Sequence, residues 1–266
     1  MAEFQLIDPI KAEKFIFMLK NINVISSQIT IYFKKNEIYC QGMDPSQICL
    51  FEFVIITEGE NNWLDYYKLQ NDTETNIGIN CIILSKILNT YKKDQAITFK
   101  LDSKKNDILG IDFNFINEKT NSIYDKEFQI PLMDINEDLL TIPNKEYAID
   151  IEIQSKIFDK LCGEFALFDE MLKIKCSEKK IEMTASGIDG KMKVNINVDD
   201  LDEFSIEEDL VYQDSFSLTY FNYMCTFHKL SDTMLLNFEK DRPMKLTYTI
   251  SDGFILKFYM GAKATD

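Results

Sequence analysis

The sequence predicts an α+β protein built from two similar domains, each with antiparallel strands and two short helices. Much of the chain alternates apolar and polar residues with a period of two, the pattern of half-buried strands. Four short segments instead carry apolar residues at helical spacing. The order strand, helix, several strands, helix, several strands occurs once before about residue 128 and once after about residue 148.

The predicted strands form two kinds of hairpin, and each kind occurs twice. Residues 27–41 alternate through Ile29, Ile31 and Phe33, turn at 34–36 and return, and residues 171–186 repeat this design. A second kind is expected at 95–115, turning at 102–107, and at 233–250, turning at 239–242. Ile31 and Ile174 are 143 residues apart. We interpret this spacing as an internal duplication of architecture; two unrelated α+β domains are the alternative.

Helices are expected at residues 9–21, 84–93, 154–165 and 217–230. Pro9 suits the first turn of a helix and Asp8 is a plausible N-cap. Although the whole chain has a formal net charge of −15, the four segments contain nine lysines and three acids, a net charge of +6 that leaves −21 elsewhere. The basic residues are lysines apart from Arg242. Because lysine acts as a point charge on phosphate, any contact with DNA is expected to be independent of base sequence.

Residues 132–143 connect the two halves, beginning after Pro131 and ending at Pro143. They mix acids and apolar residues without a clear period, which favours an extended connector whose apolar side chains dock on the protein. A short acidic helix at 136–140 is the alternative. The predicted domains are therefore residues 1–131 and 149–266, with a connector at 132–148.

Length and composition agree with two domains, because 266 residues with 45% hydrophobic and 27% charged residues supply ordinary globular material. No run of eighteen apolar residues predicts a membrane span, and the acid at Glu3 without a basic region is untypical of a signal peptide. We expect reduced, mostly buried thiols of an intracellular protein from the six widely spaced cysteines. These cysteines are Cys40, Cys49, Cys81, Cys162, Cys176 and Cys225.

Residues able to perform catalysis are few. His228 is the single histidine, expected as a solvated residue at a helix end, so most histidine-based triads and metal sites are excluded. The segment 187–191 lacks the spacing of a phosphate-binding loop and is interpreted as a turn. The acid pairs at 199–200 and 207–209 are interpreted as solvated surface. We therefore predict no enzymatic activity, no metal and no cofactor.

Six segments resemble the eukaryotic-type DNA sliding clamps, the proliferating cell nuclear antigen family. They follow the family's order and nearly its spacing over essentially the whole chain, at residues 42–50, 84–88, 132–134, 142–147, 184–187 and 256–263. Three departures are visible. Ala262 replaces a usual proline, residues 58–76 are longer and more polar than usual, and Glu178 occupies the position of a loop lysine that many relatives modify.

The resemblance implies the DNA-clamp fold, in which three chains close into a ring with antiparallel sheets outside and four helices per chain lining the hole. The protein would be a polymerase processivity factor for DNA replication and repair, located in the nucleus or at a viral replication site. Its ring edges would lie near 122–130 and 188–196. The lysines expected to face double-stranded DNA are Lys11, Lys14, Lys20, Lys86, Lys92, Lys93, Lys156, Lys160 and Lys229.

The resemblance also implies a hydrophobic pocket at the connector for short motifs of DNA polymerase, clamp loader, flap nuclease and ligase. The corresponding residues are Met43, Gln47, Ile48, Leu50, Leu140, Ile142, Pro143, Tyr147, Pro243, Tyr259, Met260, Gly261 and Ala262. For each of these, ordinary core or turn packing is the alternative. Two other functions stay open: a checkpoint-type subunit that acts in a heterotrimer, and an enzyme with an acid-based site such as a nuclease.

Overall fold

A computed structural model describes residues 2–70, 73–93, 95–101, 107–115, 124–135, 138–143 and 145–263. The chain forms two compact units, and each unit combines segments that are distant in sequence. Unit 1 comprises Met1–Pro45, Glu52–Leu139 and Ile250–Ile255. Unit 2 comprises Ser46–Phe51, Leu140–Thr249 and Leu256–Asp266.

Unit 1 is built on two runs of hydrogen-bonded strands, β5-β1-β7-β8-β9 and β4-β3-β2-β6, except that the first three residues of β4 belong to unit 2. The elements of the first half of the chain are β1 (Ala2–Leu6), α1 (Pro9–Asn21), η1 (Ile22–Val24), β2 (Gln28–Phe33), β3 (Glu37–Met43), β4 (Cys49–Ile56), β5 (Tyr66–Leu69), β6 (Thr75–Asn80), α2 (Cys81–Leu88), β7 (Gln95–Leu101), β8 (Ile108–Phe115) and β9 (Lys126–Pro131).

Unit 2 has the strand orders β14-β10-β16-β17-β18 and β13-β12-β11-β15, except that the last two residues of β17 and the first two of β18 belong to unit 1. The elements of the second half are β10 (Ile149–Gln154), α3 (Ser155–Phe165), β11 (Met171–Ser177), β12 (Lys180–Gly187), β13 (Gly190–Asn197), η3 (Val198–Asp200), β14 (Glu203–Ile206), β15 (Tyr212–Ser217), α4 (Leu218–Cys225), β16 (Thr233–Phe238), β17 (Met244–Ser251) and β18 (Phe254–Met260).

The internal duplication is confirmed. Within the described parts of the chain, each half has nine strands and two helices in the same order, with β1 corresponding to β10 and α1 to α3. The strand orders correspond too, so that β4 matches β13 and β9 matches β18. Strands β2 and β11 begin 143 residues apart, as do β3 and β12. All four predicted hairpins form, although the turn predicted at 102–107 falls, apart from Asp107, outside the described residues.

The helix predictions hold for α1 and, within one residue, for α3, but both ends of α2 and the C-terminal end of α4 were wrong. Helix α2 begins at Cys81 because the Asn80 side chain accepts hydrogen bonds from the N–H groups of Ile82 and Ile83, and it ends at Leu88. Helix α4 ends at Cys225 and continues as tight turns. Lys92, Lys93 and Lys229 therefore lie beyond the helices on which they were predicted.

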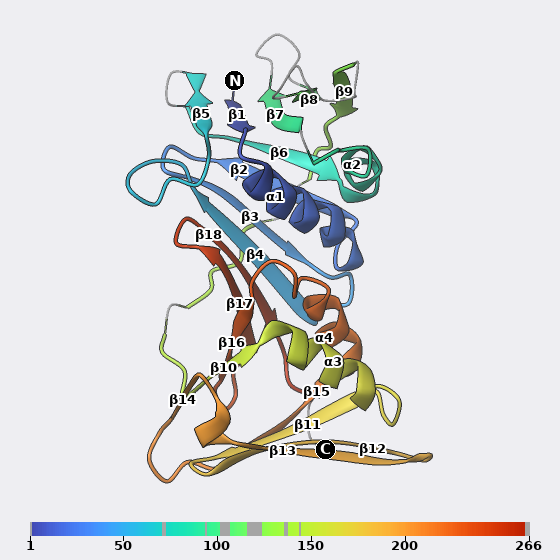
Figure 1. The fold of residues 1–266 in the computed structure, drawn as a ribbon, viewed down its shortest axis with the longest axis vertical. Helices are drawn as coiled ribbons and strands as arrows, with labels where there is room; N and C mark the ends of the chain where they lie inside the picture. The colour runs from blue at the N-terminus through green and yellow to red at the C-terminus, as the bar shows by residue number, and fades with distance from the viewer. Residues whose placement is uncertain are drawn as a thin grey trace. The chain divides into compact units, whose positions relative to one another are not determined.

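In each unit the two helices lie side by side, α1 with α2 and α3 with α4 (Figure 1). Aromatic side chains tie them to the strands. In unit 1 the ring of Phe4 stacks on Phe99 at 4.8 Å and meets Phe15 of α1 edge-on at 5.5 Å. In unit 2 Phe221 of α4 meets Phe158 of α3 edge-on at 5.3 Å and Phe216 of β15 edge-on at 6.0 Å. Such buried rings fix the helices against the sheets and leave their other faces to solvent.

The six cysteines are free and buried, as predicted. Burial raises the pKa of the Cys81 thiol and of the Cys176 thiol to about 12, so neither is a reactive thiolate at neutral pH. Within the described residues no helix is long and apolar enough to cross a membrane, and no group of three His, Cys, Asp or Glu residues is arranged to hold a metal ion.

Candidate functional site

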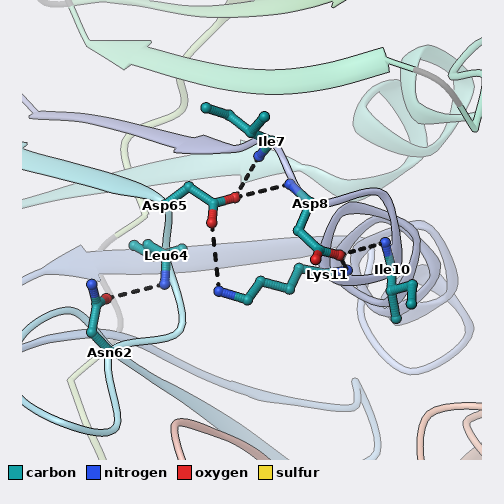
Figure 2. Close-up of polar contacts among 7 residues, drawn as sticks. All are labelled: Ile7, Asp8, Ile10, Lys11, Asn62, Leu64 and Asp65. Carbon is teal, nitrogen blue, oxygen red and sulfur yellow. Dashed lines mark hydrogen bonds and ion pairs between the residues drawn. The ribbon is translucent and has the colours of Figure 1, made fainter. Parts of the chain in front are cut away.

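The start of α1 is fixed by two aspartates from different parts of unit 1 (Figure 2). The Asp8 carboxylate accepts hydrogen bonds from the N–H groups of Ile10 (2.8 Å) and Lys11 (3.0 Å), so Asp8 is the predicted N-cap. Asp65 accepts from the N–H groups of Ile7 (2.5 Å) and Asp8 (3.0 Å). Its other oxygen lies 3.5 Å from Nζ of Lys11. Asp65 therefore holds the β1–α1 turn and partly neutralises a lysine predicted to face DNA.

The helices bury one side and carry their lysines outside it. Lys11, Lys14 and Lys20 of α1 are partly exposed, and Lys86 of α2 is exposed. Lys156 and Lys160 of α3 are exposed as well. With the observed helix bounds, the four helices contain six lysines and three acids, a net charge of +3 instead of the +6 predicted for the longer segments.

Three of the predicted lysines form ion pairs: Lys11 with Asp65, Lys93 with Glu13 at 3.3 Å, and Lys160 with Glu164 at 3.6 Å. Such surface pairs contribute about 0–1 kcal/mol, so an approaching phosphate can replace the acid. Lys14, Lys20, Lys86 and Lys156 form no ion pair with any residue that the structure describes. Within the described part of the chain, the charge of these four lysines is available to a phosphate without breaking an ion pair.

His228 differs from its prediction as a solvated residue. Its ring is partly buried, and Nδ1 donates a hydrogen bond to the carbonyl oxygen of Cys225 at 2.9 Å. Asp159 lies 3.7 Å from the same nitrogen. Since the carbonyl accepts the Nδ1 proton, His228 helps to close the turn after α4. The acid pairs at 199–200 and 207–209 are exposed, as predicted.

Unit 2 brings together parts of the predicted partner pocket. The N–H of Gly261 donates to the carbonyl of Ile48 at 3.3 Å, which places the C-terminal tail beside residues 46–51. The Tyr147 hydroxyl donates to the carbonyl of Pro243 at 3.3 Å. Arg242 stacks over the Tyr147 ring at 4.3 Å, a contact that sequence reasoning missed. Burial raises the pKa of Tyr147, and the Arg242 charge partly opposes that rise.

The predicted pocket residues differ widely in exposure. Ile48 is 42% and Leu140 50% exposed, so neither side chain belongs to the packed interior. Ile142 is partly exposed, whereas Gln47, Pro143, Pro243, Gly261 and Ala262 are exposed. Leu50, Tyr259 and Met260 are buried, so their side chains belong to the packed interior of unit 2. Met43 lies in unit 1 at the end of β3 and is partly exposed.

The first part of the connector docks on unit 1, as expected for an extended segment. The N–H of Met133 donates to the carbonyl of Gly78 on β6 at 2.9 Å. A Cβ at position 78 would lie 2.2 Å from the carbonyl oxygen of Met133, so only glycine allows this approach. Residues 138–143 contain neither helix nor strand. The alternative helix at 136–140 falls partly outside the described residues, which exclude Asn136 and Glu137.

Comparisons with known proteins cover both halves of the chain. Residues 11–139 match the family model "Proliferating cell nuclear antigen, N-terminal domain", and residues 141–263 match "Proliferating cell nuclear antigen, C-terminal domain". The chain is similar to proliferating cell nuclear antigen 2 of Drosophila melanogaster, with 26% identity over 266 residues, covering 100% of this chain and 99% of that protein.

Proposed function

The chain belongs to the proliferating cell nuclear antigen family, and we propose that three copies of it close into a ring around duplex DNA as a homotrimeric sliding clamp. Membership of this family supports a role as a processivity factor in DNA replication and repair in the nucleus. Proteins of the family are non-enzymatic clamps, and we propose that this chain likewise acts by tethering partners, without catalysis of its own.

The observation that carries the proposal is the difference between two corresponding strands. Strand β4 has a neighbour on each side, β3 and β18, and six of its eight residues are buried. Its counterpart β13 is an end strand without a buried residue, and Met192, Val194 and Ile196 on one of its faces are partly exposed. An end strand with apolar side chains is a site for pairing with another chain.

The duplication indicates which strand would pair with β13. Strand β18 lies beside β4, and their counterparts are β9 and β13. Strand β9 is one of the two end strands of the sheet β5-β1-β7-β8-β9. Pairing β9 of one chain with β13 of the next would therefore repeat a pairing that the chain already makes. Such head-to-tail contacts close into a ring when the rotation fits. Of the predicted first edge at 122–130, residues 122 and 123 lie outside the described part of the chain.

Light scattering of the purified chain tests this assembly. A homotrimer has three times the chain mass of 31.1 kDa. Val194→Asp should shift the mass toward the monomer, because it places a charge among the apolar side chains of the end strand β13. Val211→Asp, at an aliphatic residue that is 62% exposed, should leave the mass unchanged. A stable wild-type monomer would contradict the homotrimer and favour the checkpoint-type subunit that needs other chains.

Encirclement of DNA is tested by topology. A clamp loaded on nicked circular DNA should stay bound at high salt and be lost when the circle is cut, because a ring slides off a free end. Replacing Lys14, Lys20, Lys86 and Lys156 by Ala should reduce clamp-dependent polymerase processivity on unrelated sequences alike, since phosphates and not base edges are contacted. Loss at equal rates from circular and linear DNA would refute encirclement.

We further propose that unit 2 binds short replication-protein motifs at Ile48, Leu140 and Ile142. These aliphatic groups are accessible on or beside the connector and the tail. Burying two or three partner side chains at about 1.5–3 kcal/mol each, less the cost of association, gives micromolar affinity. Titration calorimetry should show that Ile142→Asp abolishes binding of a peptide with a glutamine, a spaced aliphatic residue and paired aromatic residues.

Two controls make this measurement specific. Val211→Asp adds the same charge at an exposed aliphatic position elsewhere in unit 2 and should bind the peptide as the wild type does. The Ile142→Asp chain should also keep the wild-type mass, because Ile142 lies outside both end strands. Equal binding by wild type and Ile142→Asp would show that the peptide site lies elsewhere.

A further inference from the structure

The sheet β13-β12-β11-β15 of unit 2 has one buried face and one face open to solvent. Leu172 and Ile174 of β11 and Ile181 and Met183 of β12 are fully buried. Helices α3 and α4 lie together on one side of this sheet (Figure 1). The alternate residues of the same strands form the opposite face, which we call the outer face of unit 2. In the described residues no helix covers it.

Lysines dominate the outer face of unit 2. The strand register places Lys173 opposite Thr184 and Thr184 opposite Lys193, with Lys175 opposite Glu182 in the next row. Lys191 pairs with Ser186 at one end, and Lys180 with Ser177 at the other. Five lysines and one acid give this face a net charge of +4 in a chain whose formal net charge is −15.

The fold itself does not require these lysines. In the corresponding sheet of unit 1, at a spacing of 143 residues, the positions of Lys173, Lys175 and Lys180 are occupied by Thr30, Tyr32 and Glu37. That sheet also receives the connector, through the contact between Gly78 and Met133. The same architecture therefore exists with an uncharged or acidic residue at each of these three positions, so the fold does not require the three lysines.

Most of this charge is not neutralised within the protein. Glu182 forms ion pairs with Lys180 at 3.2 Å and with Lys193. Lys173, Lys175 and Lys191 are exposed and form no ion pair with a described residue. A cluster of like charges with one shared acid is unfavourable in isolation and becomes favourable when an anion binds.

The side chains between the lysines indicate the kind of anion. They are hydroxyls and amides, such as Thr184, Ser186, Gln213 and Asn195, which together with lysine are the groups that contact nucleic-acid phosphates. Among the described residues of this face there is no aromatic side chain to stack on a base, which argues against recognition of unpaired bases. Aside from Met171 at its margin, the face also has no apolar anchor of the kind found at the centre of protein interfaces.

We propose that the outer face of unit 2 binds the sugar–phosphate backbone of a nucleic acid, at a second site on the opposite side of the sheet from helices α3 and α4. This contact is independent of base sequence and does not require DNA to pass through a ring. It rests on the outer lysines alone, so it is separable from the proposed clamp function. A clamp with this surface contacts a second length of nucleic acid outside the hole.

Covalently closed circles separate the two sites, because they cannot enter a closed ring without a loader. Binding of the full chain to a single-stranded circle and to a duplex minicircle is measured by fluorescence anisotropy at several salt concentrations. Losing three phosphate contacts in Lys173→Ala/Lys175→Ala/Lys191→Ala should lower the slope of log K against log salt by about 2.7 for duplex and about 2.1 for single strands. For duplex, the wild type should lose about 40-fold more affinity than the variant between about 50 and 200 mM salt.

Matched variants keep the test specific. The corresponding Lys→Arg triple should bind as the wild type does, because arginine also contacts phosphate. Glu182→Gln should bind more tightly and with a steeper salt slope, since it releases Lys180 and Lys193. Lys14→Ala/Lys20→Ala/Lys86→Ala should leave binding to circles unchanged. If the helix variant loses binding to the circles, the ring is open, which contradicts the proposed closed clamp. The outer site is then tested by the Lys173→Ala/Lys175→Ala/Lys191→Ala variant alone.

Two results would overturn the proposal. Equal affinity and salt slope for the wild type and the outer Lys→Ala triple, with both folded by circular dichroism, would show that these lysines do not contact nucleic acid. The second result is a competition in which polyglutamate displaces the circles as well as an oligonucleotide does at the same concentration of negative charge. That result would show a site for acidic protein segments. Stronger displacement by the oligonucleotide supports the phosphate backbone as the ligand.

Discussion

Asp65 is expected to combine two roles that different substitutions separate. Its carboxylate accepts hydrogen bonds from the N–H groups of Ile7 and Asp8 and pairs with Lys11. Loss of a capping side chain costs about 0.5–2 kcal/mol, and hydrogen bonds to charged groups are at the stronger end of the usual range. Asp65→Ala should therefore destabilise the chain by about 2 kcal/mol. At about 2–4 °C per kcal/mol, this lowers the melting temperature by about 4–8 °C.

Asp65→Asn should be much milder for stability. Asparagine keeps one oxygen for the two N–H groups and loses the ion pair with Lys11, which contributes about 0–1 kcal/mol at a surface. It also frees the Lys11 charge for DNA. The expected result is a melting temperature within about 4 °C of the wild type together with a steeper salt dependence of DNA binding, by up to about 0.9 per released lysine.

Glu164→Gln is the control for Asp65→Asn. It frees Lys160 on α3 from a similar ion pair of 3.6 Å but removes no hydrogen bond to backbone that the structure describes. It should therefore change the salt slope without changing the melting temperature measured by calorimetry. If Asp65→Ala and Glu164→Gln melt at the wild-type temperature alike, Asp65 does not hold the start of α1. If neither neutral variant alters the salt slope, Lys11 and Lys160 do not contact DNA.

Two further predictions concern stability and protonation. Calorimetry should show that Gly78→Ala destabilises the chain by about 1–3 kcal/mol, because the added Cβ meets the carbonyl oxygen of Met133 at 2.2 Å and breaks a backbone hydrogen bond. Gly163→Ala in α3, where the added Cβ meets nothing within 4 Å, should instead stabilise the chain by about 0.5–1 kcal/mol. A change in stability of the same sign in both variants would refute this contrast. Hydrogen bonds from Lys193 and Lys180 hold the pKa of Glu182 at about 2, so this group stabilises the fold above its unfolded pKa near 4.5 and loses that contribution as the pH falls toward 2. Carbon-detected NMR titration should find the Glu182 pKa raised by Lys193→Gln, and an unchanged pKa would mean that the pair does not form in solution.

The strands could be predicted because their burial follows the period of the sequence. Ile29, Ile31 and Phe33 are buried while their neighbours are partly exposed, as the alternation required. Helix α2 was displaced because Ile82 and Ile83 are apolar yet exposed, so hydrophobic spacing gave no sign of its first turn. The capping residue at position 80 was a local signal for the true start that hydrophobic periodicity does not contain.

The site was predictable to the extent that it depends on local sequence. The lysines of α1 follow from the helix itself, but Asp65 lies 57 residues from Asp8 along the chain and meets it through the pairing of β1 with β5. No local pattern indicates such a contact. The outer lysines did leave a signal, because Lys173 and Lys175 alternate with buried residues and so share one face of a strand.

The distribution of charge connects the two basic surfaces. The formal net charge of the whole chain is −15. The four helices carry +3 and the outer face of unit 2 carries +4, so the rest of the chain carries −22. Charges beyond about 8 Å are largely screened at physiological salt, so a nucleic acid at either surface experiences mainly the nearby lysines. At lower salt the acidic remainder acts over a longer range and repels DNA from everywhere else. As salt is lowered, nucleic acid should therefore prefer the two basic surfaces more strongly over the rest of the protein surface. A protein with evenly distributed acidic charge cannot show such a preference.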